Sequence, residues 1–216
     1  MTRRLPSAIL GFPLALTCSL CQAAPMGFKD SWMMMGDFSS NFQELTVNQA
    51  LTPRDALGLT AVRLRPGEER ALENYELTFT RLLKRWNLPH AQANVWFFGG
   101  LGETSGGALS EARLTASPGL QLDYETTRVY GALNARTYRG GDGINHSVVS
   151  ARAGFSFYEV DYEQTQPWFI LEARRMSYMS NDIELTPMLR LIHKRYFVEA
   201  GANMSGKPRL SFMYIF

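Results

Sequence analysis

The chain has 216 residues, of which 12% are aromatic, and its 22 Lys and Arg residues nearly balance its 20 Asp and Glu residues. A protein that binds nucleic acid through phosphate contacts needs a basic surface, so this balance excludes nucleic acid as an expected partner. Beyond the N-terminal region no segment contains roughly 18 uninterrupted apolar residues, and the sequence therefore predicts no transmembrane helix.

The first residues have the three parts of a secretory signal peptide. Arg3-Arg4 supply a positive start, Ile9–Cys21 is an apolar run too short to span a membrane, and Cys21-Gln22-Ala23 fits a small-residue cleavage site. We therefore predict a signal peptide over residues 1–23 and a mature chain over residues 24–216. Both cysteines lie in the leader, so the predicted mature chain has no disulfide and no thiolate metal site.

The last eight residues of the chain are its most informative segment. Apolar side chains occupy every second position, at Leu210, Phe212, Tyr214 and Phe216, so an extended strand presents all four on one face. This ending resembles the closing strand of bacterial outer-membrane β-barrels, in which alternate hydrophobic residues and a terminal Phe are the assembly signal. The resemblance implies a barrel in the outer membrane, with membrane lipid and the barrel-assembly machinery as partners.

Segments of about ten residues with the same alternation recur along the predicted mature chain. In Glu73–Leu83, for example, Tyr75 and Leu77 alternate with Glu76 and Thr78. Apolar side chains toward lipid and polar side chains toward the lumen are typical of transmembrane barrels. The sequence therefore predicts an all-β fold, an antiparallel up-and-down transmembrane β-barrel of about twelve strands, with ten strands or a soluble β-sandwich as alternatives. The expected strands are residues 30–38, 42–51, 56–65, 73–83, 91–102, 112–124, 128–138, 147–158, 167–177, 183–192, 196–203 and 209–216.

Three segments depart from simple alternation. Val95–Phe98 is apolar on both faces, so its inward side chains must meet an apolar interior or lie at an interface. Pro118 lies inside an expected strand and predicts an interruption, because proline cannot donate a ladder hydrogen bond. Four consecutive apolar residues, Trp32–Met35, leave the register of the first strand undecided.

The connections between the expected strands alternate in length. Thr52–Asp55, Tyr124–Thr127 and His193–Arg195 are short, whereas Gly102–Glu111 and Arg139–His146 are longer and glycine-rich. In outer-membrane barrels the short turns face the periplasm and the long loops face outward. An even strand count then predicts that both termini are periplasmic.

Charged residues gather on the inward parity of the expected strands. Ionised groups in a narrow barrel are costly unless they are paired, so we expect Arg–carboxylate pairs and water in the interior. The network either fills the lumen or lines a narrow pore, since barrels of about twelve strands lie between filled eight-strand and open sixteen-strand ones. The predicted lumen network consists of Glu44, Glu76, Arg136, Arg152, Glu172, Arg174, Arg190 and Glu199.

The leading functional hypothesis is a small outer-membrane barrel that forms a narrow pore, or serves transport, for a small polar solute. The first alternative is a filled structural barrel that acts through its loops or a partner protein. An envelope enzyme is less favoured, because the three histidines form no recognisable catalytic constellation with a nucleophile. The sequence accordingly predicts no catalytic residue, no cofactor and no metal site.

Methionine suggests one more alternative. Thioethers bind Cu(I), and Met33 and Met35 share one face of a strand, which would suit a copper-handling protein. Flexible apolar filling of an irregular interior is the favoured interpretation of these residues.

Overall fold

The computed structural model describes residues 25–65, 70–141, 144–179 and 182–216. The predicted signal peptide lies outside these residues. In the described part of the chain, no helix is long and apolar enough to cross a membrane. The described residues form β1 (Trp32–Ser39), β2 (Phe42–Ala50), β3 (Asp55–Leu64), β4 (Leu72–Leu88), β5 (Ala91–Gly106), β6 (Arg113–Ala116), β7 (Gly119–Thr126), β8 (Val129–Gly140), β9 (Asn145–Ser156), β10 (Gln166–Met176), β11 (Glu184–His193), β12 (Tyr196–Ala202) and β13 (Pro208–Ile215).

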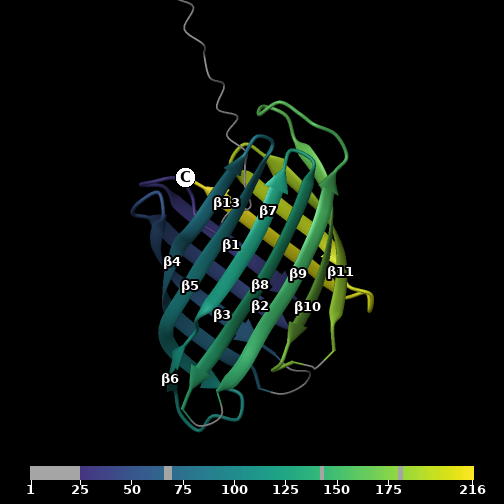
Figure 1. The fold of residues 1–216 in the computed structure, drawn as a ribbon. Coiled ribbons are helices and arrows are strands. Elements are labelled where there is room, and N and C mark those ends of the chain that lie inside the picture. The colour runs from purple at the N-terminus through teal and green to yellow at the C-terminus, as the bar shows by residue number, and fades with distance from the viewer. Residues whose placement is uncertain (1–24, 66–69, 142–143, 180–181) are drawn as a thin grey trace, which may run out of the picture.

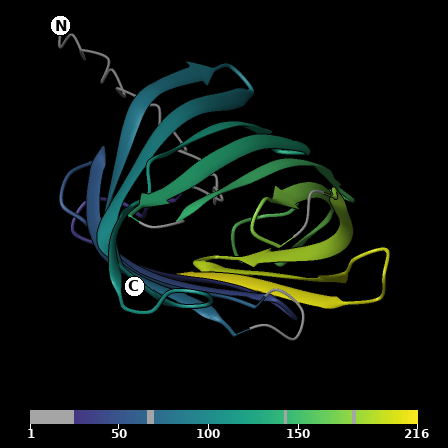
Figure 2. The same cartoon turned by 90° about the horizontal axis from the view of Figure 1, so that it is seen from below.

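The strands form one closed antiparallel barrel (Figure 1). Consecutive strands pair along the chain, and β13 returns to pair with β1. Viewed along the barrel axis, the strands surround a common interior (Figure 2). β6 and β7 are two halves of one barrel strand, because both pair with β5 on one side and with β8 on the other. The predicted all-β barrel of twelve strands is therefore confirmed.

Pro118 separates the two halves of this strand, as the sequence predicts. The Ser117 N–H donates to the Gly100 carbonyl at 2.8 Å, and the Pro118 carbonyl accepts from the Thr137 N–H at 2.9 Å. The backbone therefore bonds to both neighbouring strands around the proline, which lacks only its own donor. The interruption also leaves the Ser117 side chain fully buried inside the barrel.

The pairing of the first and last strands confirms the predicted closing strand. The Trp32 N–H donates to the Phe216 carbonyl at 2.8 Å, and Met35 lies opposite Met213 in the ladder. This register turns Met33 inward and settles the parity that the sequence leaves open. Trp32 and Phe216 lie at the same end of the barrel, which we call the terminus end, and the opposite end is the loop end.

β4 and β5 are longer than predicted. The expected strand over residues 73–83 continues to Leu88, and the turn falls at Pro89-His90. The pairing shifts between Leu82 and Lys84, so one extra residue is inserted in β4 at this point. Such a bulge moves every following side chain to the other parity, and the alternation that marks the strand in the sequence therefore breaks at Leu82.

The loop-end connections are shorter than predicted. The expected loop Gly102–Glu111 is reduced to residues 107–112, because β5 continues to Gly106. The expected loop Arg139–His146 is likewise reduced to residues 141–144. At the terminus end the turns are short except for the connection over residues 157–165.

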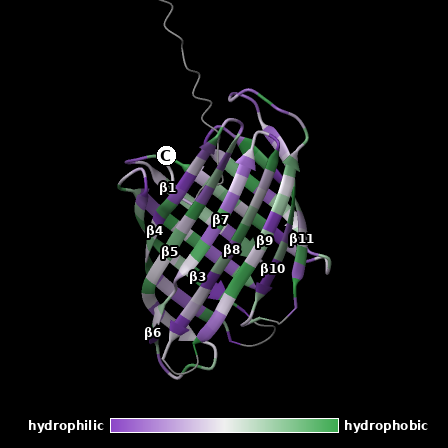
Figure 3. Ribbon diagram, viewed as in Figure 1, coloured by the Kyte–Doolittle hydropathy of each residue, from purple (hydrophilic) through white to green (hydrophobic). Residues whose placement is uncertain are grey.

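Hydrophobic and hydrophilic residues alternate along the strands (Figure 3). The outer face exposes large apolar side chains such as Tyr75, Leu77 and Leu133, whereas Glu76 and Tyr130 point inward and are buried. Val95–Phe98 follows the same rule, since Trp96 is buried in the interior core and Phe98 packs against it. The inward side chains of this segment therefore meet the apolar interior that the sequence requires.

The interior contains two separate apolar clusters. The terminus-end cluster consists of Met26, Met33, Ala50, Ala56, Leu82, Trp96, Tyr130, Ala132, Trp168, Ile170, Met188, Ile192, Phe197 and Met213. The loop-end cluster consists of Phe42, Val62, Leu64, Leu72 and Met176, with Leu109, Val148, Tyr178 and Met179 packed against it. Polar and charged side chains occupy the space between them.

Candidate functional site

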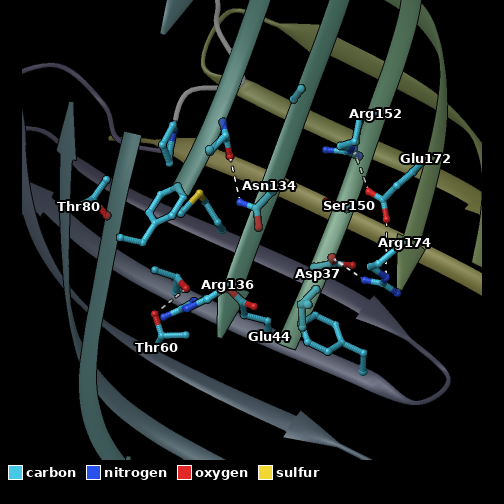
Figure 4. Close-up of a pocket in the computed structure, with 18 of the residues that line it drawn as sticks. Asp37, Glu44, Thr60, Thr80, Asn134, Arg136, Ser150, Arg152, Glu172 and Arg174 are labelled. Carbon is cyan, nitrogen blue, oxygen red and sulfur yellow. Dashed lines mark hydrogen bonds and ion pairs between the residues drawn. The ribbon is translucent and has the colours of Figure 1, made fainter. Parts of the chain in front are cut away.

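Eleven charged residues of the interior form what we call the charged belt. Each lies on the inward parity of its strand, and together they come from nine of the strands around the barrel, so the closure of the barrel brings them together. Figure 4 shows several of them pointing toward one another around a cavity. The belt contains all eight residues of the predicted lumen network and three more, and its members are Asp37, Glu44, Glu76, Arg136, Arg152, Glu172, Arg174, Glu184, Arg190, Glu199 and Arg209.

The first group of the belt is centred on Glu76. One of its oxygens pairs with Arg136, and the other accepts a 2.5 Å hydrogen bond from the Ser117 hydroxyl. Arg136 also donates to the Ser117 oxygen at 3.0 Å and lies 3.9 Å from Glu44. A serine, a guanidinium and two carboxylates from four different strand segments are thereby tied together.

Gly100 makes room for this group. A Cβ at this position would lie 2.3 Å from a carboxylate oxygen of Glu76 and 2.3 Å from the hydroxyl of Ser117. We expect Gly100→Ala to destabilise the barrel by about 2 kcal/mol, because the added methyl group displaces hydrogen-bonded polar atoms that are buried. The midpoint of urea unfolding in detergent micelles measures the loss. Gly131→Ala is the matched control, since its Cβ would meet only one carbonyl oxygen at 3.9 Å, and an equal loss in both variants would contradict the explanation.

The second group is centred on Glu172. Its carboxylate pairs with Arg152 at 2.9 Å, with Arg174 at 3.6 Å and with Arg209. Arg209 and Arg174 also reach across to Asp37, at 2.9 Å and 3.3 Å. Three arginines therefore share two carboxylates, and the Arg–Asp37 contacts join β10 and β13 to β1.

The third group is centred on Glu199, whose side chain is fully buried. It accepts a 2.7 Å hydrogen bond from Arg190 and pairs with Arg152 on its other oxygen. The guanidinium of Arg190 lies between two rings, 4.2 Å from the centroid of Tyr130 and 4.7 Å from that of Phe197. Ring faces attract a guanidinium cation, so the two rings hold Arg190 at the boundary of the terminus-end cluster.

The predicted network lacks Arg209, Asp37 and Ser117 of these groups, and it also lacks the belt residue Glu184, which lies 3.5 Å from Arg174. Arg209 has the inward parity of the last strand, and that parity could have indicated it. Asp37 has the same inward parity as Met33 and Met35. The sequence leaves the register of the first strand undecided, so it gives no sign that Asp37 points inward. Ser117 has no sequence signal, because its inward position depends on the irregular backbone beside Pro118.

A cavity of about 260 Å³ with a mixed polar and apolar lining lies beside the belt. Its lining includes threonine hydroxyls from β2, β3 and β4, among them the Thr46–Thr60 pair at 2.8 Å. It also includes Arg136, Arg152 and Arg174 from β8, β9 and β10 (Figure 4). A hollow of about 400 Å³ at the loop end shares Arg174 with this cavity. A third cavity of about 200 Å³ continues toward the terminus end and shares Asp37, Glu44, Arg152 and Arg209 with the first.

The segment before β1 turns into the barrel at the terminus end. Pro25 lines both inner cavities, and its carbonyl accepts a 3.1 Å hydrogen bond from the Asn48 amide. Met26 is 4% exposed and belongs to the terminus-end cluster, whereas Phe28 is 57% exposed. Pro25 and Met26 therefore occupy the interior as part of its filling.

Four buried methionines lie in this same cluster, and one, Met176, lies in the loop-end cluster. Met33, Met188 and Met213 are surrounded by apolar side chains, and Met35 packs against them. Such surroundings give the thioethers a packing role, which is the favoured interpretation from the sequence.

The predicted assembly residues lie on the outer face of β13 and at its end. Tyr214 stacks on Tyr196 with ring centroids 4.6 Å apart, and Phe216 stacks on Tyr214 at 5.5 Å. Phe212 stacks on Phe38, and Leu210 is exposed on the same face. The four side chains form the continuous apolar stripe that the sequence pattern predicts.

Comparison with known proteins relates this architecture to porins. No protein-family model and no curated protein matches the chain. Among solved structures, the KdgM porin in complex with disordered oligogalacturonate has a TM-score of 0.50 and 13% sequence identity, over 86% of this chain and 98% of that chain. The fold is that of an outer-membrane β-barrel. A second KdgM porin structure gives the same values, and OccK11 (OpdR) of Pseudomonas aeruginosa has a TM-score of 0.41 and 11% identity, over 85% of this chain and 63% of that chain.

Proposed function

We propose that the chain is an outer-membrane barrel that conducts small polar solutes through a narrow lumen. The observation that carries the proposal is the series of three cavities along the barrel interior, which share belt residues at each boundary. The middle cavity is walled by hydroxyl groups and ion pairs, which can replace the water around a polar solute. Arg174 lines both the loop-end hollow and the middle cavity, so a solute that passes from one to the other has to pass this side chain.

The charges around the middle cavity indicate which solute charge the cavity favours. Its wall carries four arginines, Arg136, Arg152, Arg174 and Arg209, against three carboxylates, Asp37, Glu44 and Glu172. The arginines are engaged with carboxylates, so the wall favours anions only weakly. One structural neighbour is a complex with oligogalacturonate, and acidic oligosaccharides are therefore solutes to compare with neutral sugars of the same size.

The proposal includes the orientation of the barrel. We infer that both termini face the periplasm, because most connections at the terminus end are short turns. The loop end then faces outward, and the apolar stripe from Leu210 to Phe216 is the segment read by the barrel-assembly machinery and then held in lipid. Protease protection in intact cells, with a tag inserted at residues 141–144, tests this orientation.

Planar-bilayer recording tests the pore. We expect the purified barrel to give discrete openings whose conductance is well below that of a sixteen-strand porin in the same salt, because the lumen is largely filled. A heat-inactivated sample of the same protein is the control. Current that never rises above the lipid baseline would reject the proposal.

A filled structural barrel is the second candidate. The two apolar clusters favour it, since one occupies each end of the interior. A barrel of this kind would act through its loops or a partner protein. It predicts no conductance in the wild-type chain and none in a variant whose terminus-end cluster has been opened.

A further inference from the structure

A small polar hollow lies on the barrel at the loop end, outside the charged belt. Its volume is about 70 Å³, and it is lined by Ser40, Asn41, Gln43, Arg63 and Arg65. Among the described residues, the lining contributes two guanidinium groups, two amides and a hydroxyl. Such a set offers many hydrogen-bond donors and two positive charges to one ligand.

Backbone pairing fixes this arrangement. Gln43 lies directly opposite Arg63 in the β2–β3 ladder, and the Arg65 N–H donates to the Asn41 carbonyl at 2.9 Å. Alternation along β3 then places Arg63 and Arg65 on the outer face, where both are exposed. Among the described residues, Arg63 has one ion pair, to Glu73 at 3.4 Å through a single nitrogen. A guanidinium fork can bind a second anion through its other nitrogens.

The outer surface beside the hollow, on the side of the terminus end, is apolar. Strand pairing fixes the positions of its side chains, as it does for the hollow. Leu59 lies opposite Leu77, and Leu77 lies opposite Leu101, so three leucines form a row across β3, β4 and β5. Leu59 is 66% exposed, Leu77 59% and Leu101 63%, so the three are among the most exposed apolar residues of the described barrel. Leu59 and Arg63 are both on the outer parity of β3, so the apolar row lies directly below the basic hollow.

We propose that this surface binds a membrane lipid with a phosphate headgroup, with the phosphate in the hollow of Arg63 and Arg65 and the acyl chains along Leu59, Leu77 and Leu101. Arginine forks match phosphate oxygens, and the amides and hydroxyl supply the remaining donors. The leucine row supplies the apolar contact that a free phosphate would not use. The position at the loop end assigns the lipid to the leaflet at that end of the barrel.

Native mass spectrometry of the folded barrel in neutral detergent tests the proposal with three probes. Dioleoyl phosphatidic acid has both the phosphate and the chains, dioleoylglycerol has the chains alone, and glycerol 3-phosphate has the phosphate alone. We expect phosphatidic acid to bind most tightly. We also expect Arg63→Gln combined with Arg65→Gln to weaken it about tenfold, because each arginine at a membrane surface contributes modestly to anionic-lipid binding.

The double variant Arg54→Gln with Arg81→Gln is the matched control. It removes the same charge from exposed arginines at the terminus end, where Arg81 also has one carboxylate partner, Asp55 at 3.5 Å. Binding should change less than twofold in this control, and heat-modifiable gel mobility verifies that both variants fold. Equal losses in the two double variants would overturn the site, and glycerol 3-phosphate binding as tightly as phosphatidic acid would replace the lipid by a soluble phosphate.

Discussion

Glu199→Gln is expected to lower the free energy of unfolding by about 3 kcal/mol or more, the largest single loss we expect in the belt. The side chain of Glu199 is completely buried and neutralises both Arg190 and Arg152. The amide has nearly the same shape but no charge, so two guanidiniums remain in the interior with one carboxylate fewer. The cost arises from the charges left behind and not from a cavity.

Urea or guanidinium unfolding of the barrel in lipid vesicles, followed by tryptophan fluorescence, measures this loss. Glu73→Gln is the control, because it removes a carboxylate from the exposed pair with Arg63, whose nitrogen lies 3.4 Å away. Exposed pairs contribute about 1 kcal/mol at most, so the control should remain close to the wild type. A loss below about 1 kcal/mol for Glu199→Gln would mean that water, and not Glu199, compensates the two arginines.

The parity of the strands explains why so much of this interior could be predicted from the sequence. Successive side chains of a strand point to opposite faces, so Glu76 and Arg136 are assigned inward once the apolar set of each strand is recognised. The closing strand was equally accessible, since its apolar set starts at Leu210 and ends at the chain terminus. These features depend on one strand at a time.

The features that the sequence does not reveal depend on two or more strands. Asp37 meets Arg174 and Arg209 only because β1 closes on β13, and no spacing along the chain encodes that contact. The bulge after Leu82 removes the alternation that would have extended β4. Pro25 and Met26 have no strand pattern at all, so their place inside the barrel follows only from the three-dimensional packing.

The layered interior depends on both strand parity and contacts between strands. The parity of a residue decides whether its side chain points into the barrel. The position of the residue along its strand decides whether that side chain joins an apolar cluster or the charged belt. Met213 is in the terminus-end cluster, and Arg209, four residues earlier on the same face, is in the belt. The interior therefore has a charged section between two apolar ones. The apolar section at the terminus end is completed by a segment that is not part of any strand.

Met26→Asp is expected to raise the conductance of the barrel several-fold above that of the wild type. An unpaired carboxylate is costly among the apolar side chains that surround Met26, which is 4% exposed. Leaving the lumen relieves that cost, because Pro25 and Met26 have one described hydrogen bond to the barrel wall, from the Asn48 amide to Pro25. The other described hydrogen bonds of the segment to β2 lie next to β1, where Asp30 and Ser31 bond to Ala50. Its departure opens the terminus-end cluster beside the two inner cavities that Pro25 lines.

Phe28→Asp is the matched control, since it places the same charge two residues away on a side chain that is 57% exposed, and its conductance should equal that of the wild type. The reverse experiment uses Pro25→Cys with Asn48→Cys in a mature chain that has no other cysteine if the predicted leader is removed. Oxidation should hold the segment inside and abolish openings, and reduction should restore them. If Met26→Asp and the oxidised cysteine pair both conduct as the wild type does, the segment does not block the lumen. If none of these proteins conducts, the filled barrel is the better description and the pore is rejected.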